Sequence, residues 1–135
     1  MIVLKNNARI FLLLVALIAI ACCKKAGYGG DASIRGYVHV LHFNSTFTQY
    51  ISQYPGKDLY VYVVYGNHPG YDKRIKTDYN GNFEFPYLYK GDYKVYVYSR
   101  DSTFTDPSGM VAVVRNISIT SRKEVYNTDT LKVFQ

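Results

Sequence analysis

The stretch TDYNGNFEFPYLYKGDYKVYVYS, residues 77–99, decides the fold of this chain. Apolar and polar side chains alternate along residues 83–85 and 93–99, which is typical of half-buried β-strands. Asn80 and Gly81 stand before the first run, and both residues tolerate the positive φ of a tight hairpin turn. The stretch therefore predicts a strand, a turn, a second strand, a corner and a third strand.

The same alternation recurs through the rest of the chain and predicts seven strands. We expect them at residues 34–43, 59–65, 73–78, 82–85, 93–99, 111–119 and 130–134. Pro86 should end the fourth strand because it has no N–H for a ladder. Seven strands at this spacing predict an all-β chain folded as a two-sheet antiparallel β-sandwich. Residues 44–57 and 100–109 are expected to be long loops, and no internal repeat is expected.

Residues 1–21 predict a signal peptide, the one helix we expect, and not a part of the sandwich. Lys5 and Arg9 precede a run of apolar residues at 11–21, which is the pattern of a secretory signal. At about 1.5 Å per residue, a helix of this length would span only about half of a ~30 Å hydrocarbon core. We therefore expect no permanent transmembrane helix.

The end of the signal, Ala-Ile-Ala before Cys22 and Cys23, resembles a bacterial lipobox. The resemblance implies that Cys22 is acylated and becomes the mature N-terminus, with Cys23 as the alternative. A disulfide framework is not expected, because adjacent cysteines rarely bridge and the chain has no other cysteine. Residues 22–31 then form the lipidated cysteine and a Gly-rich tether, and residues 32–135 form one β-sandwich domain.

The residues after Cys22 bear on the location of the protein. Cys23 stands where an inner-membrane retention signal would have Asp, so the lipobox resemblance implies an outer-membrane lipoprotein. Lys24 and Lys25 follow instead of acidic residues, which slightly favours the periplasmic face over the cell surface. The formal net charge is +6, but the basic residues are dispersed, so we expect membrane attachment through the lipid and no binding of nucleic acid.

Three segments together resemble prealbumin-like (transthyretin-like) domains, the group that includes the carboxypeptidase regulatory-like modules. They are residues 34–38 (IRGYV), residues 77–85 (TDYNGNFEF) and residues 88–95, where Leu, Gly, Tyr and Val recur at the family spacing. The resemblance implies a β-sandwich and indicates little about function. With the lipobox, the chain is similar to small cell-envelope lipoproteins of Bacteroidetes-type bacteria. Ser102 and Thr130 lie in short motifs that resemble the O-glycosylation sites of such bacteria, and their modification is left open.

The residues that carry chemistry do not predict an enzyme. The only histidines are His39, His42 and His68, and no nucleophile motif accompanies them. His39 and His42 should lie on opposite strand faces, so we expect no metal site and no cofactor. Asp101 and Asp106 could bind calcium weakly, but capping of their own turn is the favoured interpretation.

The tyrosines are the anomaly of the composition, because the chain has 15 Tyr, 7 Phe and no Trp. Tyr60, Tyr62, Tyr96 and Tyr98 should lie opposite buried valines and form an aromatic patch if their strands pair. Such a patch could bind a protein or a glycan, or simply cover the sheet. We therefore predict a non-catalytic binding or adaptor module. The alternatives are an accessory structural subunit of a surface assembly such as a fimbria, joined through an edge strand, and a glycan-binding surface module.

Overall fold

The computed structural model describes residues 25–135, which form two β-sheets and no helix. The predicted signal peptide (1–21), Cys22, Cys23 and Lys24 lie outside the described residues. The described strands are β1 (Tyr28–Phe43), β2 (Tyr50–Pro55), β3 (Tyr60–Tyr65), β4 (Lys73–Lys76), β5 (Asn82–Leu88), β6 (Gly91–Arg100), β7 (Met110–Ile119), β8 (Val125–Asn127) and β9 (Leu131–Phe134). Between residues 25 and 135 no helix is long and apolar enough to cross a membrane.

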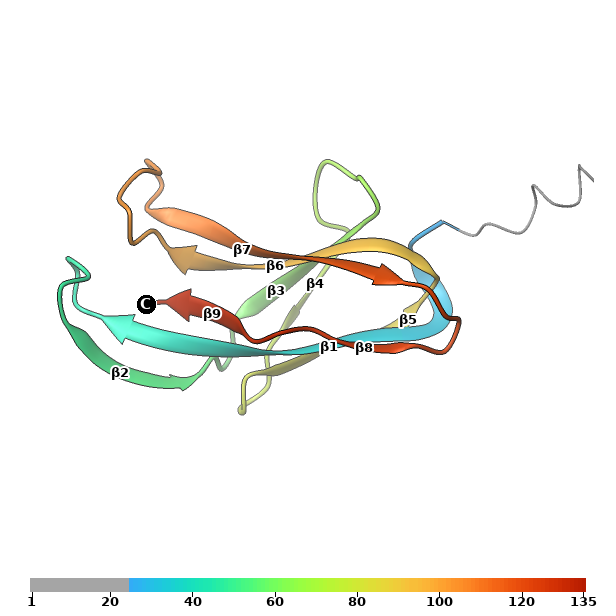
Figure 1. Cartoon of the computed structure of the whole chain (residues 1–135), viewed down its shortest axis with the longest axis horizontal. Coiled ribbons are helices and arrows are strands. Elements are labelled where there is room, and N and C mark those ends of the chain that lie inside the picture. The colour runs from blue at the N-terminus through green and yellow to red at the C-terminus, as the bar shows by residue number, and fades with distance from the viewer. Residues whose placement is uncertain (1–24) are drawn as a thin grey trace, which may run out of the picture.

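The two sheets are built around β1 and β6. The first half of β1 pairs with β5 and β8, and its second half pairs with β2 and β9. The other sheet has the order β4-β3-β6-β7 and is antiparallel throughout. The two layers face each other along their length (Figure 1). The all-β prediction is therefore confirmed. The expectation of antiparallel pairing throughout is wrong, because β8 and β9 both pair parallel with β1. The more specific prealbumin-like assignment stays a prediction.

The expectation of seven strands is wrong, because nine strands occupy the described region. β2 lies in a segment that we expected to be a loop, and it was missed because it is largely exposed and lacks an apolar row. β8 is only three residues long. β5 also continues past Pro86 to Leu88, because its pairing with β1 shifts register between Ala32 and Ile34. At such an irregularity a proline can lie in a strand without breaking a regular ladder.

The core lies between the sheets and comes from the inward residue of each alternating pair. Ile34, Val38 and Val40 of β1 face Val61, Val63, Val95 and Val97 of the second sheet, and all seven are no more than 2% exposed. Period-2 alternation places every second side chain of these strands on the outer face. The residues that flank the buried valines are therefore presented to solvent.

One end of the sandwich is closed by an aromatic cluster that joins the two sheets, called here the phenylalanine end. Its members are Phe43, Phe47, Tyr50, Phe104 and Phe134. Phe47 belongs to the β1–β2 loop, Phe104 to the β6–β7 loop, and their ring centroids are 5.7 Å apart. The described chain enters at the other end, where β1 begins (Figure 1).

The two loops at the phenylalanine end share a five-residue pattern, so the expectation of no internal repeat is wrong at this scale. Residues 44–48 read Asn-Ser-Thr-Phe-Thr and residues 101–105 read Asp-Ser-Thr-Phe-Thr. The first side chain of each loop accepts a hydrogen bond from the backbone N–H four residues later, at 2.9 Å in the first loop and 2.7 Å in the second. Phe47 and Phe104 both have a φ of 55°, a conformation rare for residues other than glycine. Each loop thus holds its phenylalanine toward the other sheet by the same device.

Candidate binding surface

The outer face of the β4-β3-β6-β7 sheet brings together five tyrosine rings, called here the tyrosine platform. They are Tyr60, Tyr62, Tyr71, Tyr96 and Tyr98. Tyr62 pairs directly with Tyr96 across β3 and β6, and their rings are stacked at 5.0 Å with an interplanar angle of 8°. Tyr98 packs edge-on against both rings, with centroids 5.6 Å from each. All four tyrosines singled out from the sequence therefore lie in one contiguous cluster.

The fifth ring, Tyr71, could not be predicted from alternation because it lies in the loop between β3 and β4. Its ring stands edge-on to Tyr62 with a centroid distance of 5.0 Å. It is 48% exposed, close to the 42% of Tyr60 and the 47% of Tyr98. These rings keep about half of their surface in contact with solvent although each packs against a neighbouring ring.

Two cations of β4 border the platform on the side of Tyr60. The Arg74 guanidinium lies 4.4 Å from the centre of the Tyr60 ring, and the Lys76 ammonium lies 5.2 Å from it. A hydrogen bond between the side chains of Arg74 and Tyr62 is the main cause that raises the pKa of Arg74. Cation–π contacts of this kind hold long side chains against aromatic rings while the charge stays accessible.

On its other side the platform continues onto apolar side chains of β7. Val114 pairs with Tyr96, and Ala112 pairs with Tyr98. Burial among these neighbours is the main cause that raises the pKa of Tyr96, with Tyr98 adding to it. The surface therefore runs from cations, across five rings, to aliphatic groups.

The histidines do not assemble a catalytic or metal site in the described residues. His39 contacts Tyr37 at 3.3 Å and Gln53 at 3.0 Å, and His68 pairs with Asp72 at 2.7 Å on the surface. The His42 ring lies edge-on to the Tyr54 ring, with a centroid distance of 6.4 Å. No group of three or more His, Cys, Asp or Glu residues that could hold a metal ion occurs within residues 25–135.

The acidic loop residues serve their own turns. Asp101 accepts hydrogen bonds from the backbone N–H groups of Thr103, Thr105 and Asp106 at 2.7–2.8 Å. The side-chain bond from Thr103 and these N–H groups hold the pKa of Asp101 far below its usual range. The bond from the Ser108 hydroxyl is the main cause that lowers the pKa of Asp106. These bonds agree with turn capping, because they occupy the oxygens that a calcium ion would need.

One depression on the described surface shares only Lys76 with the platform and its bordering cations. It has a volume of about 750 Å³ and is lined by residues that include the Arg35–Glu84 ion pair, which closes at 2.9 Å. Thr128 also lines it, but its hydroxyl oxygen is buried and has no partner within the described residues. A ligand in this depression could not reach that oxygen without a rearrangement. Ser102 and Thr130, the two sites of possible glycosylation, are both exposed.

No protein-family model matches the chain, and no curated protein matches it at a significant level. Among solved structures, the chain is similar to a proposed carbohydrate-binding protein from Pseudomonas aeruginosa at 12% identity and a TM-score of 0.47, over 82% of this chain and 92% of that one. It is also similar to (S)-allantoin synthase at 14% identity and a TM-score of 0.42, over 79% of this chain and 43% of that one. A 9R-lipoxygenase from Cyanothece aligns at 20% identity and a TM-score of 0.35, over 87% of this chain and 20% of that one. Similarities at this level do not decide the function of the chain.

Proposed function

We propose that this protein is a non-catalytic binding module of the bacterial envelope, and that the tyrosine platform binds a glycan. The observation that carries the proposal is the gathering of five partly exposed tyrosine rings on one sheet face, bordered by Arg74 and Lys76. Large exposed apolar patches are rare on soluble monomers, and where they occur they often mark an interaction surface.

The chemistry of the platform suits a saccharide. Sugar rings present C–H groups on their faces and hydroxyls at their edges. Aromatic rings can pack against the C–H faces of a sugar, while tyrosine hydroxyls and an arginine guanidinium can hydrogen-bond its hydroxyl groups. The platform is an open sheet face: its five rings line neither the depression beside the Arg35–Glu84 pair, which reaches only Lys76, nor a smaller one beside Tyr79. An open face favours an extended chain over a small molecule, which usually needs a concave pocket.

The composition of the platform supports a binding role. Its five rings and two cations include no carboxylate, imidazole or thiol that could act as a general base or nucleophile. The ordinary role of such a surface is to hold a ligand. Protein contact is the competing use, since Tyr and Arg are also enriched where proteins bind each other.

Attachment to the outer membrane through Cys22 is part of the proposal and is supported by the sequence alone. The described chain begins at the end of the sandwich opposite the phenylalanine end, so a lipid tether would leave the platform on the side of the domain (Figure 1). Lys24 and Lys25 favour the periplasmic face. Metabolic labelling with an alkyne fatty acid should mark the wild type and not Cys22→Ala. Labelling that persists in Cys22→Ala and is lost in Cys23→Ala would move the lipid to Cys23.

An oligosaccharide array tests the ligand class. We expect binding by the wild type and a loss of about tenfold or more in affinity for Tyr62→Ala, whose ring touches the other four. Tyr79→Ala is the matched control, because Tyr79 is 75% exposed and lies outside the platform. Equal binding by wild type and Tyr62→Ala would contradict the proposal. Absence of saccharide binding, with crosslinking of the platform to one envelope protein, would replace the glycan with a protein partner.

A further inference from the structure

β7 forms an edge of its sheet, and one side of its backbone has no strand beside it among the described residues. The strand pairs with β6 along its whole length, from the Gly91–Ile119 pair to the Arg100–Met110 pair. The sheet order β4-β3-β6-β7 ends there. An edge of ten residues is long for an exposed strand, and proteins usually protect such edges from pairing with other chains.

The pairing register identifies the backbone groups that face outward. The Asp101 N–H donates to the Gly109 carbonyl at 2.9 Å, in line with the β6–β7 register. Because hydrogen-bonded and non-bonded pairs alternate along an antiparallel ladder, the backbone groups of Met110, Ala112 and Val114 point away from β6. Side chains of the chain itself already bond some of these outward groups: the Val114 carbonyl accepts from Arg115 at 3.1 Å, and the Ser108 hydroxyl bonds both the N–H and the carbonyl of Met110 at 3.3 Å. The N–H and carbonyl of Ala112 and the N–H of Val114 are the outward groups left for a partner on this part of the described edge.

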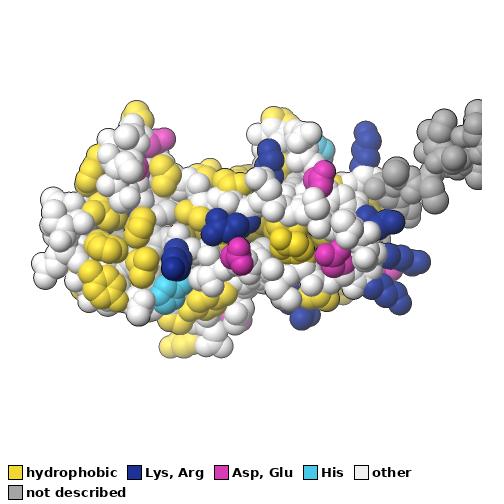
Figure 2. Space-filling view, in the orientation of Figure 1, with side chains coloured by type: hydrophobic (Ala, Val, Ile, Leu, Met, Phe, Trp, Pro, Cys, Tyr) yellow, Lys and Arg dark blue, Asp and Glu magenta, His cyan; other side chains and the backbone are white. Residues whose placement is uncertain are grey.

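The first half of β7 is apolar and exposed on both faces. Met110 is 40% exposed and Val114 is 42% exposed on the outer face, while Val111 is 36% exposed on the inner face. In the second half of the strand, by contrast, Ile117 and Ile119 are only 3% and 2% exposed. Hydrophobic side chains gather over the same end of the sandwich in Figure 2, where Phe104 is 66% exposed.

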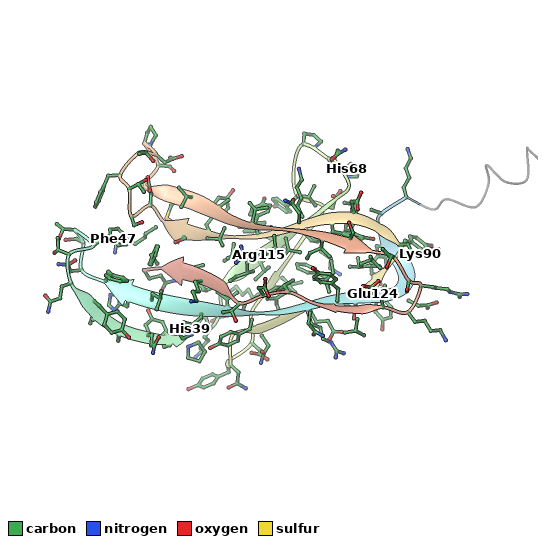
Figure 3. All side chains as sticks on the ribbon, viewed as in Figure 1. His39, Phe47, His68, Lys90, Arg115 and Glu124 are labelled. Atoms are coloured by element: carbon green, nitrogen blue, oxygen red, sulfur yellow. The ribbon has the colours of Figure 1, made fainter. Side chains whose placement is uncertain are left out.

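Arg115 marks the place where the exposed half ends. Its guanidinium donates to the carbonyls of Val114 and Thr130 at 3.1 and 3.4 Å, and forms no ion pair with any carboxylate of residues 25–135. In Figure 3 it lies between the β6–β7 layer and the β8–β9 layer. A partly buried guanidinium bonded only to neutral carbonyls has an unused capacity for a carboxylate.

We propose that the first half of β7 is the docking strand for an extended segment of a partner polypeptide. The segment has apolar residues against Met110 to Val114 and a carboxylate that meets Arg115. A polypeptide strand fits because it supplies N–H and C=O groups at the same period as the free edge, which neither a glycan nor a lipid does. A second copy of this chain fits less well, because like net charge would be brought together: +6 for the whole sequence, and +4 without Lys5 and Arg9 of the predicted signal peptide. This inference rests on β7 and is independent of glycan binding by the platform.

The test uses a fluorescently labelled synthetic peptide in which valine and threonine alternate and a single glutamate follows them. The control peptide has glutamine in place of that glutamate. We expect the glutamate peptide to bind the full chain and the glutamine peptide to bind about tenfold more weakly. Amide exchange measured by NMR should slow at Ala112 and Val114 on binding. The proposal is overturned if the glutamate peptide does not bind, or if its binding slows amide exchange on another edge strand instead of β7.

Two variants separate docking from folding. Ala112→Pro removes one outward N–H, which an edge strand tolerates, and should weaken peptide binding about tenfold. Arg115→Gln should bind the glutamate and glutamine peptides equally. This ratio of affinities is measured on folded protein, so it does not depend on a change in stability. Tyr62→Ala should bind the peptide as the wild type does, so failure of the platform and failure of the docking strand are distinguishable. Retained glutamate preference in Arg115→Gln would contradict the role of Arg115.

Discussion

The tyrosine platform and the phenylalanine end are both clusters of five aromatic rings, but they are placed in opposite ways. The platform lies on the outer face of one sheet, and its rings come from β3, β6 and the β3–β4 loop. The phenylalanine end joins both sheets, with Phe134 from β9 and Phe104 from the β6–β7 loop on either side of Phe47. Four of its five members lack a hydroxyl, whereas all five platform rings carry one.

The difference teaches how to tell an aromatic cluster that stabilises the fold from one that is available for binding. A cluster that connects two layers gains packing from both, and a phenyl ring suits it because no polar group needs a partner. A cluster on one layer contributes only cross-strand contacts of about 0.2–1 kcal/mol per pair, and its outer side faces solvent, where a ligand can reach it. Stability should therefore depend on the phenylalanine end, and binding on the platform.

The largest effect on stability is expected from Phe47→Ala. This ring touches Phe43, Phe104 and Phe134, and its loss should lower the free energy of unfolding by about 2 kcal/mol, less than for a fully buried Phe. Urea unfolding measures the change, and glycan binding should be retained. A change below about 0.5 kcal/mol, the range of ordinary surface substitutions, would contradict the structural role of this end.

Tyr62→Ala should cost less stability, about 1 kcal/mol, because the ring packs on one face of one sheet. Its main effect is expected on binding. If this variant lost as much stability as Phe47→Ala, the platform would be a structural cluster and the comparison would fail. Urea unfolding of both variants under one set of conditions decides the order.

Acid should weaken the phenylalanine end before it affects the platform. The pKa of Asp101 is lowered in the folded state by its hydrogen bonds, chiefly with Thr103, so the unfolded chain binds the proton more readily. The stabilisation is therefore present above the unfolded pKa of about 4 and is lost as the pH falls below it. The melting temperature should drop over this acid range. Asp101→Asn should make that drop shallower, because an asparagine does not titrate. Asn44 accepts the equivalent backbone hydrogen bond in the twin loop without a charge.

The smallest effect on stability is expected from Tyr98→Phe, which removes one hydroxyl and keeps the ring. The free energy of unfolding should change by less than about 0.5 kcal/mol, because the side chain is 47% exposed. Saccharide binding should weaken if this hydroxyl bonds the ligand. A stability loss above about 1 kcal/mol would show that the hydroxyl has a structural partner.

Alternation made the central sheet predictable. Buried valines stand at alternate positions in the middle of both β3 and β6, so the tyrosines between them share the outer face. These valines are Val61, Val63, Val95 and Val97. β2 was not predictable because it is held by pairing with β1 and has no apolar row of its own. Tyr71 was missed for a similar reason, since a loop residue has no periodicity that would direct its ring. In the twin loops, turn capping by Asp101 was expected from the sequence, whereas the matching role of Asn44 was missed.

Glycan binding by the tyrosine platform is tested by NMR titration of the wild type with the oligosaccharide that binds best on the array. The titration follows the tyrosine ring resonances. We expect the chemical-shift changes to concentrate on the rings of the tyrosine platform and to be abolished by Tyr62→Ala. The rings are those of Tyr60, Tyr62, Tyr71, Tyr96 and Tyr98. Shifts confined to the residues around the Arg35–Glu84 pair, or shifts that survive in Tyr62→Ala, would contradict it.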